Sequence, residues 1–333
     1  MNCQKGATIL VTGASGFIGS EVIKNLIEKR YPVIGIDAKD PIDNLSGSLN
    51  FTFLRADISN KGPILDEPKN TDVLIHCAAL VHNRSDDLSK NNYFSINYDG
   101  TRNILSFLDK DKVKHIIFLS TVSVYGDSAN ISIVDENTRT APADYYGESK
   151  LAAESAVKYY CQSYGIHYSI FRLVPVYGDS FLLNVEKRTC LPGKTAFYKI
   201  GSGEQRLSLV SINNVVDVIV GSINNPVFLD RTFIVKDLQD YSINEIISVL
   251  KECHSHMNKP VLSIPTWVPT VIFKFKGLFP GKKGKCYEAQ FKKIASDAVF
   301  SGTKLFSTGV ELRWDLRTTL MGRTDAMTSG TGQ

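Results

Sequence analysis

The fold of this chain is decided by ATILVTGASGFIG at residues 7–19, where a short apolar run leads into a turn with three glycines. Residues 17–30 then repeat apolar side chains at helical spacing, which predicts a strand, a tight turn and a helix. Gly13 would allow the tight turn, Gly16 would let a pyrophosphate approach the backbone, and Gly19 would let the helix pack closely on the strand. N–H groups at a helix start favour an anion. We therefore expect a dinucleotide-binding turn, with an ordinary glycine-rich turn as the alternative.

An acidic residue closes the next apolar run. Residues 32–36 resemble a buried strand, and Asp37 follows them at about 20 residues from the glycines, as in dinucleotide-binding folds. A carboxylate there accepts hydrogen bonds from an adenosine ribose and repels a 2′-phosphate. The sequence therefore favours NAD over NADP, although Lys39 lies close by. A solvated turn carboxylate before Pro41 is the alternative.

Strand-like and helix-like segments alternate through the first half of the chain, which predicts βαβ units. The expected class is α/β, with a Rossmann-like, doubly wound parallel sheet and a smaller mixed α/β substrate domain at its carboxyl edge. We expect residues 1–175 to bind the dinucleotide and residues 176–322 to bind the substrate, either as a separate domain or interleaved with the first. Residues 323–333 are expected to form a flexible tail. Strands are expected at residues 51–54, 73–77, 116–119, 168–173, 207–212 and 232–235, and helices at 98–108, 145–164 and 242–253.

A tyrosine and a lysine share one face of the predicted helix at residues 145–164. Tyr146 and Lys150 are four positions apart, whereas the fourth neighbour of Tyr145 is Ser149. A phenol with a pKa of about 10 is a weak base at neutral pH, but a nearby ammonium stabilises its phenolate. This pattern predicts a catalytic base with its electrostatic partner, and a solvated helix face is the alternative.

A hydroxyl is expected beside this pair. The segment LSTVSVYG at residues 119–126 follows a strand-like run, and Thr121 is the predicted hydrogen-bond partner of the reacting substrate oxygen. Ser123 is a neighbouring donor, although a turn rich in Ser and Thr can be purely structural.

Composition narrows the class of protein. The 38 basic and 34 acidic residues give a net charge of only +4, which does not suggest a nucleic-acid partner. Six scattered cysteines without a CxxC pair predict reduced thiols, and no apolar run reaches the ~18 residues of a transmembrane helix. A cytoplasmic protein is the expectation. His76, His82 and His115 are expected in the core or at strand ends, and no metal is expected.

The motifs together resemble the extended short-chain dehydrogenase/reductase family, in its nucleotide-sugar epimerase/dehydratase branch, over residues 7–220. The matching pieces lie at residues 12–19, 56–58, 76–79, 97–103, 120–126, 146, 150, 172 and 176–178. The resemblance implies Asp57 at the adenine, an Ala78–Leu80 turn along the dinucleotide, and Arg206 on the nucleotide diphosphate of a sugar. The implied cofactor set is Gly13, Ser15, Gly16, Phe17, Ile18, Gly19, Asp37, Asp57, Ile58, Ala78, Ala79, Leu80, Asn97, Tyr146 and Lys150. The implied substrate set is Thr121, Ser123, Tyr146 and Arg206.

Departures from the family pattern discriminate between activities. Family dehydratases carry Asp-Glu directly after the threonine, but here Val122 and Ser123 stand there, so dehydration is disfavoured. The resemblance then implies a 4-epimerase of a UDP-hexose or UDP-N-acetylhexosamine, with tightly bound NAD and a transient 4-keto sugar. Pro175 stands where many epimerases have Asn, which favours the alternative of an NAD(P)H-dependent 4-ketoreductase of a 6-deoxy-N-acetylhexosulose. A non-catalytic NAD(H) sensor and a 3β-hydroxysteroid-type dehydrogenase are further alternatives.

Two partner surfaces are expected. The family resemblance implies a homodimer formed through the helices at residues 98–108 and 145–164. Residues 261–285 combine aromatic side chains with lysines, a composition that fits weak peripheral contact with an anionic membrane during polysaccharide synthesis. An apolar flap followed by a solvated basic loop is the alternative.

Overall fold

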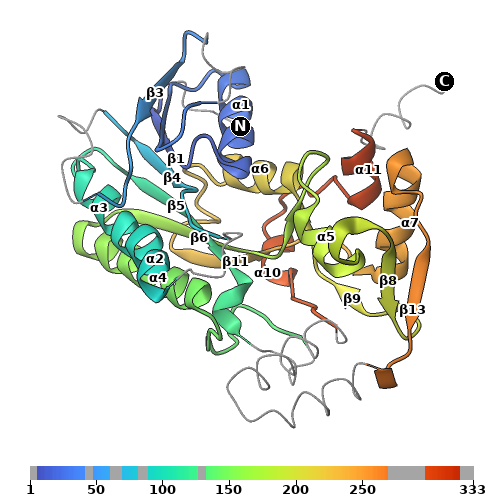
Figure 1. Cartoon of the computed structure of the whole chain (residues 1–333). Helices are drawn as coiled ribbons and strands as arrows, with labels where there is room; N and C mark the ends of the chain where they lie inside the picture. Colours follow the sequence, from blue (N-terminus) through green and yellow to red (C-terminus); the bar gives the residue numbers. More distant parts are fainter. Residues whose placement is uncertain are drawn as a thin grey trace.

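A parallel sheet forms the larger part of the protein (Figure 1). The computed structural model describes residues 6–41, 48–60, 70–81, 89–126, 133–268 and 297–322. Within these residues the sheet has seven strands in the order β11-β6-β5-β4-β1-β2-β3, all parallel, so the chain winds outward in both directions from β1 and β4. The strands are β1 (Ile9–Thr12), β2 (Val33–Asp37), β3 (Phe51–Arg55), β4 (Val73–His76), β5 (His115–Thr121), β6 (His167–Leu173) and β11 (Arg231–Val235). The predicted doubly wound α/β fold is confirmed.

Helices cover both faces of this sheet. On one face, α1 (Phe17–Glu28) packs against α6 (Ile212–Gly221), and on the other α3 (Gly100–Phe107) packs against α4 (Tyr145–Tyr164). Alternate strand residues point to opposite faces: Ile9 and Val11 join the core with α1, while Leu10 joins the core with α3 and α4. Two cores therefore hold the sheet rigid, and its carboxyl edge is where the loops converge.

Most predicted elements are present, and two differ from the prediction. The helix predicted at 145–164 is α4 with those bounds. The helix predicted at 98–108 instead belongs to a longer helical segment of α2 (Lys90–Phe94), a π-helical turn η2 (Ser95–Asp99) and α3. The strand predicted at 207–212 is split into β9 (Arg206–Leu207) and β10 (Val210–Ser211), because the two halves pair with different strands, β12 and β7.

A smaller part lies beside the sheet and has its own core (Figure 1). Its strands pair in twos: β7 (Val176–Tyr177) with β10, β9 with β12 (Tyr241–Ser242), and β8 (Phe197–Ile200) with β13 (Val261–Ile264). Its helices are α5 (Leu183–Thr189), α7 (Ile243–Cys253) and α11 (Leu316–Met321), with short helical turns at η4 (Pro192–Lys194) and η5 (Ser255–Met257). The short helices η3 (Val122–Tyr125) and α10 (Thr303–Phe306) pack on the large sheet instead. Between these elements the chain returns to the large sheet, where α6 packs on α1 and β11 pairs with β6.

None of the described helices combines the length and the apolar character that crossing a bilayer requires. The four cysteines within the described residues, Cys77, Cys161, Cys190 and Cys253, are free thiols.

Candidate active site

The glycine turn follows β1 directly and lies against the end of β4. Gly13 has a φ of +71°, and a Cβ there would be 2.7 Å from the backbone nitrogen of Ala78. A Cβ on Gly19 would overlap the carbonyl oxygen of Gly13. Glycine at these positions therefore lets the turn, the first helix and the β4 loop approach one another more closely than any other residue would allow.

The start of α1 is open to a ligand. Its N-cap is the exposed Gly16, and no side chain among the described residues caps the first turn. The ring of Phe17 stacks on Phe181 at 4.6 Å and Ile18 packs on the core, so both residues offer the site their backbone N–H groups. Uncapped N–H groups at a helix start are suited to a pyrophosphate.

Asp37 is joined to this turn. Its Oδ2 accepts a hydrogen bond from the Ser15 N–H at 3.0 Å and its Oδ1 accepts one from the Lys39 N–H at 2.9 Å. The Ser15 hydroxyl donates to the Lys39 carbonyl at 3.2 Å. The carboxylate predicted to bind the ribose therefore lies beside the phosphate turn, and its remaining lone pairs can accept further bonds.

Asn97 holds the loop after β4. Its side chain is fully buried: Oδ1 accepts from the Leu80 N–H at 2.7 Å, and Nδ2 donates to the Leu80 carbonyl at 3.0 Å and to Ser149 Oγ at 3.0 Å. The amide is thus bonded to protein on both sides. Asn97 positions the partly exposed Ala78–Leu80 turn and joins it to α4.

His76 is a buried, neutral member of the same network. The Thr101 hydroxyl donates its only proton to the Asn97 carbonyl at 2.6 Å, so it accepts from His76 Nε2–H at 2.9 Å. His76 Nδ1 then accepts from the Thr12 hydroxyl at 2.5 Å. Burial and the nearby Lys150 charge lower the pKa of His76 to about 3. The histidine is a core residue, as predicted, and so is His115, whereas His82 lies outside the described residues.

Asp57 and Ile58 lie at the end of β3 on the α3 side. Asp57 is exposed, and its Oδ1 accepts from both the N–H and the hydroxyl of Ser59, at 2.9 and 2.7 Å. Ile58 is buried, and its carbonyl accepts from Asn103 Nδ2 at 2.9 Å. The exposed carboxylate is available to a ligand, while Ile58 anchors the loop to α3.

The predicted catalytic hydroxyls are brought together. Thr121 ends β5, and Tyr146 lies in the first turn of α4, where Asp144 caps the helix by accepting from the Gly147 N–H at 2.7 Å. Burial raises the pKa of Tyr146 above its ordinary value, and the neighbouring Thr121 hydroxyl acts in the opposite direction. Tyr145, the preceding residue, is 48% exposed.

Lys150 lies one turn further along α4 and is almost completely buried, at 2% exposure. Its ammonium is 4.1 Å from the centre of the Phe118 ring. Burial lowers the pKa of Lys150 to about 7, against the opposing effects of Glu154 and Cys77. Its charge is therefore marginal near neutral pH and depends on its surroundings.

The substrate residues are less closely grouped. Ser123 lies beside Thr121, whose Oγ1 accepts from the Ser123 N–H at 3.1 Å. Arg206 is exposed on β9, where its backbone N–H donates to Asp297 at 2.8 Å, while the next side chain, Leu207, is buried in the core of the smaller part. The Arg206 side chain thus points to the opposite side of the strand from that core.

Sequence reasoning missed three residues of this site. The Tyr93 ring lies 6.3 Å from the Tyr146 ring, and a buried ion pair of Glu154 and Arg172 lies behind Lys150. Glu154 follows Lys150 by one helical turn, and that spacing indicated only a helix with pairs of charged residues. The sequence did not indicate that Glu154 is buried, and this burial is what makes it part of the site.

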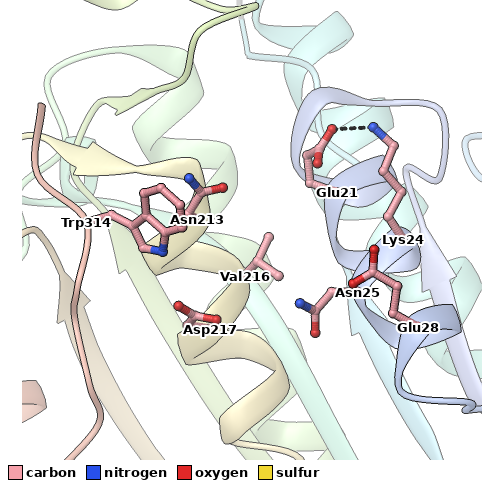
Figure 2. A pocket seen from close by; sticks show the side chains of 8 residues that line it. All are labelled: Glu21, Lys24, Asn25, Glu28, Asn213, Val216, Asp217 and Trp314. Atoms are coloured by element: carbon pink, nitrogen blue, oxygen red, sulfur yellow. Dashed lines mark hydrogen bonds and ion pairs between the residues drawn. The ribbon is translucent and has the colours of Figure 1, made fainter. Parts of the chain in front are cut away.

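A surface cavity of about 190 Å³ lies elsewhere, between α1 and α6 (Figure 2). Its lining includes Glu21, Glu28, Asp217, Lys24 and Trp314, with an ion pair of Glu21 and Lys24 at 2.6 Å. Burial raises the pKa of the Asp217 carboxyl. None of the predicted site residues lines this cavity.

Comparisons with known proteins agree with these motifs. Residues 9–234 match the model of the NAD dependent epimerase/dehydratase family. The chain is 31% identical to a UDP-glucose 4-epimerase of Vibrio cholerae over 83% of each chain. It is 26% identical to the N-acetyl-alpha-D-glucosaminyl-diphospho-ditrans,octacis-undecaprenol 4-epimerase of Escherichia coli O157:H7, over 90% of this chain and 89% of that one. The fold matches the crystal structure of a UDP-glucuronic acid 4-epimerase from Bacillus cereus in complex with NAD, with a TM-score of 0.73, 22% identity and coverage of 95% and 97%.

Proposed function

Because the chain belongs to the NAD dependent epimerase/dehydratase family, we propose that it is a nucleotide-sugar 4-epimerase that uses NAD. The observation that carries the proposal is the placement of the Tyr146 phenol beside the Thr121 hydroxyl, with the buried Lys150 one helical turn further along α4. The same strand end has Val122 and Ser123 where a dehydratase needs two carboxylic acids. The site can thus move a proton at a sugar hydroxyl but has no acid there to expel water.

The residues present fit NAD. The turn with Gly13, Gly16 and Gly19, the uncapped start of α1 and the carboxylate of Asp37 would hold the pyrophosphate and the adenosine ribose. Asp57 and the Ala78–Leu80 turn would line the rest. Bound NAD+ would supply a cationic ring that favours the Tyr146 phenolate and a carbon that takes a hydride from the sugar and returns it. We propose NAD rather than NADP because the Asp37 carboxylate repels a 2′-phosphate.

The chain's own residues manage the proton. The Tyr146 oxygen takes the proton from the O4 hydroxyl of the sugar as its C4–H bond breaks, and returns it when the hydride arrives on the opposite face. Thr121 holds O4 by hydrogen bonding, and the charged Lys150 lowers the cost of the phenolate. Burial raises the pKa of Tyr146 and lowers that of Lys150, so it disfavours the charged form of each group.

A 4-ketoreductase is the second candidate, and Pro175 favours it. Pro175 follows β6 where many epimerases have an asparagine, and its carbonyl accepts from the Val210 N–H at 3.2 Å. A proline here offers no amide to a sugar. Such an enzyme would perform only the reducing half of the reaction, consume NAD(P)H and leave no 4-epimer of a hydroxyl sugar.

One incubation separates the two functions. Purified protein is given UDP-glucose or UDP-N-acetylglucosamine without added cofactor, and the products are separated by chromatography. Formation of the 4-epimer supports the epimerase, whereas turnover only of a 4-keto sugar with NAD(P)H would overturn it. A third sample with a polyprenyl-diphosphate-linked N-acetylglucosamine tests the lipid-linked substrate in the name of the Escherichia coli relative. Absence of turnover in all arms, with bound NAD(H), would support a sensor.

Four finer features belong to the same proposal. Arg206 would contact the nucleotide diphosphate after movement of its exposed side chain. A homodimer would form through α3 and α4, where Tyr159 is 76% exposed. Weak membrane contact would use residues 261–285, of which only Val261–Ile264 and the next four residues lie in the described part; Leu262 and Trp267 are 48% and 64% exposed there. The free cysteines suit a cytoplasmic protein that serves polysaccharide synthesis.

A further inference from the structure

A buried carboxylate lies behind the proposed catalytic lysine. Glu154 is 1% exposed, and both its oxygens are bonded: Oε2 accepts from Arg172 Nη2 at 2.7 Å, and Oε1 accepts from Arg172 Nε at 3.0 Å. Oε1 also accepts from the hydroxyl of Ser120 at 2.5 Å. Removing a carboxylate from water is costly, so a position that retains one in the core needs an explanation.

The hydrogen-bonded network of Glu154, Arg172 and Ser120 lies next to the proposed catalytic residues but includes none of them. Glu154 follows Lys150 by one turn on the same face of α4, and Ser120 immediately precedes Thr121 on β5. Arg172 extends the network through Nη1, which donates to the Tyr125 hydroxyl at 2.8 Å. The carboxylate thus lies where its charge acts on Lys150, while its hydrogen bonds fix it to two strands of the sheet.

We propose that Glu154 is a positioning residue for the reaction: its buried negative charge, held in place by Arg172 and Ser120, keeps the Lys150 ammonium charged inside the protein. This inference rests on the proposed function for its kinetic part. A hydrophobic side chain of similar size would fill the same space, and a buried ion pair is seldom retained for stability alone. The electrostatic role accounts for the carboxylate, because Glu154 opposes the effect of burial on the pKa of Lys150.

Other titratable groups lie near Lys150 and could also affect its charge. From β4 come His76, which is neutral, and Cys77, whose pKa burial raises to about 12, so neither supplies a charge at neutral pH. From the other packed elements come Arg172 on β6, Tyr125 on η3, Tyr93 on α2 and Tyr146 on α4 itself. Glu154 is therefore the carboxylate that balances Lys150 from its own helix.

The direct test follows the titration of Lys150 by NMR in protein labelled with 13C at the lysine ε-carbon, with the signal assigned by Lys150→Arg. In Glu154→Gln we expect the pKa of Lys150 to fall by about 1 unit or more. The loss of kcat on the alkaline side, which follows deprotonation of Lys150, should move to lower pH by the same amount. A purely structural role would reduce kcat or stability without moving this limb of the pH profile.

Two further variants keep the test decisive. Glu154→Gln leaves Arg172 as an unpaired buried cation and can impair folding, so the double variant Glu154→Gln/Arg172→Met removes both charges. The double variant should fold and still show the lowered pKa of Lys150; a return to the wild-type value would overturn the proposal. Glu148→Gln is the matched control, because it removes a carboxylate from the surface of α4, where Glu148 pairs with Lys90 at 2.7 Å, and it should leave the titration unchanged.

The NMR readout is independent of turnover. A wild-type protein that converts no sugar but shows the shift in Glu154→Gln contradicts the proposed function and supports the electrostatic role. A protein that epimerises sugars with the same pH profile in wild type and Glu154→Gln supports the function and overturns this inference.

Discussion

The carboxylate of Asp37 accepts a hydrogen bond from the backbone N–H of Ser15 at 3.0 Å, which joins the end of β2 to the glycine turn after β1. The two oxygens are used differently, since Oδ1 accepts from the Lys39 N–H at 2.9 Å. One side chain therefore shapes the phosphate turn and also presents negative charge where an adenosine ribose would bind.

Asp37→Asn should shift the cofactor preference away from NAD. The amide oxygen can still accept from Ser15, but the charge that repels a 2′-phosphate is gone. We expect the ratio of NAD to NADP affinity to fall about tenfold or more, the size of losing one charge-assisted hydrogen bond. Calorimetric titration with both cofactors measures this ratio. Asp40→Asn, at an exposed carboxylate paired with Arg55, should leave it unchanged, and an equal fall there would refute the assignment.

Tyr146→Phe should abolish turnover and leave cofactor binding intact. The substitution removes only the oxygen that exchanges a proton with O4, so we expect kcat to fall by about 10²–10⁴-fold. Product chromatography measures kcat, and calorimetry measures NAD binding. Tyr145→Phe is the matched control on the exposed neighbour and should keep full activity. Near-normal activity of Tyr146→Phe would exclude this residue as the base.

Lys150→Met should inactivate the enzyme and yet stabilise the cofactor-free protein at neutral pH. Burial lowers the pKa of Lys150 to about 7, so between this value and the ordinary 10.5 the unfolded chain binds a proton that the native protein does not. Burial of the lysine therefore costs stability at pH 7, and this cost fades as the pH rises toward 10.5. We expect the free energy of unfolding of Lys150→Met to exceed that of wild type by about 2 kcal/mol at pH 7.

Urea unfolding of the cofactor-free protein at several values between pH 6 and about pH 9.5 measures this difference. The advantage of Lys150→Met should shrink steadily as the pH rises. A difference that is the same at both ends of the range would show that the titration of Lys150 does not contribute to stability.

Gly19→Ala should disrupt both the glycine turn and NAD binding. The added Cβ would overlap the Gly13 carbonyl oxygen, which belongs to the backbone and cannot rotate away. The first turn of α1 must then move, and we expect a loss of at least about 2 kcal/mol of stability together with NAD affinity. Gly221→Ala, at the end of α6 with no atom within 4 Å of the new Cβ, is the control and should be neutral or slightly stabilising. Equal thermal stability of the two variants would contradict the close contact.

The parts of the site that follow from local chemistry are predictable from the sequence. The helix with Tyr146 and Lys150 has clear ends: Asp144 caps its first turn, and Gly165, at a φ of +66°, ends it. The glycine turn and the carboxylate after β2 are likewise set by residues close together in the chain. In each case the local backbone geometry requires a particular residue type, so the sequence alone indicates the structure.

The parts that depend on distant contacts are not predictable in this way. The π-helical turn around Asn97 has no marker of its own, because its inward amide is explained only by Leu80 and Ser149 on other elements. Glu154 carries the residue type of an exposed helix position, and only the arrival of Arg172 from β6 makes it a core residue. A strand was predicted at residues 232–235 and is present as Arg231–Val235, but nothing in its sequence indicates that it pairs with β6.

The placement of β11 has a consequence for how the protein is made. The large sheet receives its outer strand only after the chain has passed through β7, α5 and β8–β10, so β6 remains an unprotected edge on the ribosome until residue 235 has emerged. A fragment that ends at residue 175 would lack both β11 and α6 and would expose the apolar surface of α1 that α6 normally covers. The two parts therefore have to be expressed and refolded together, as one chain.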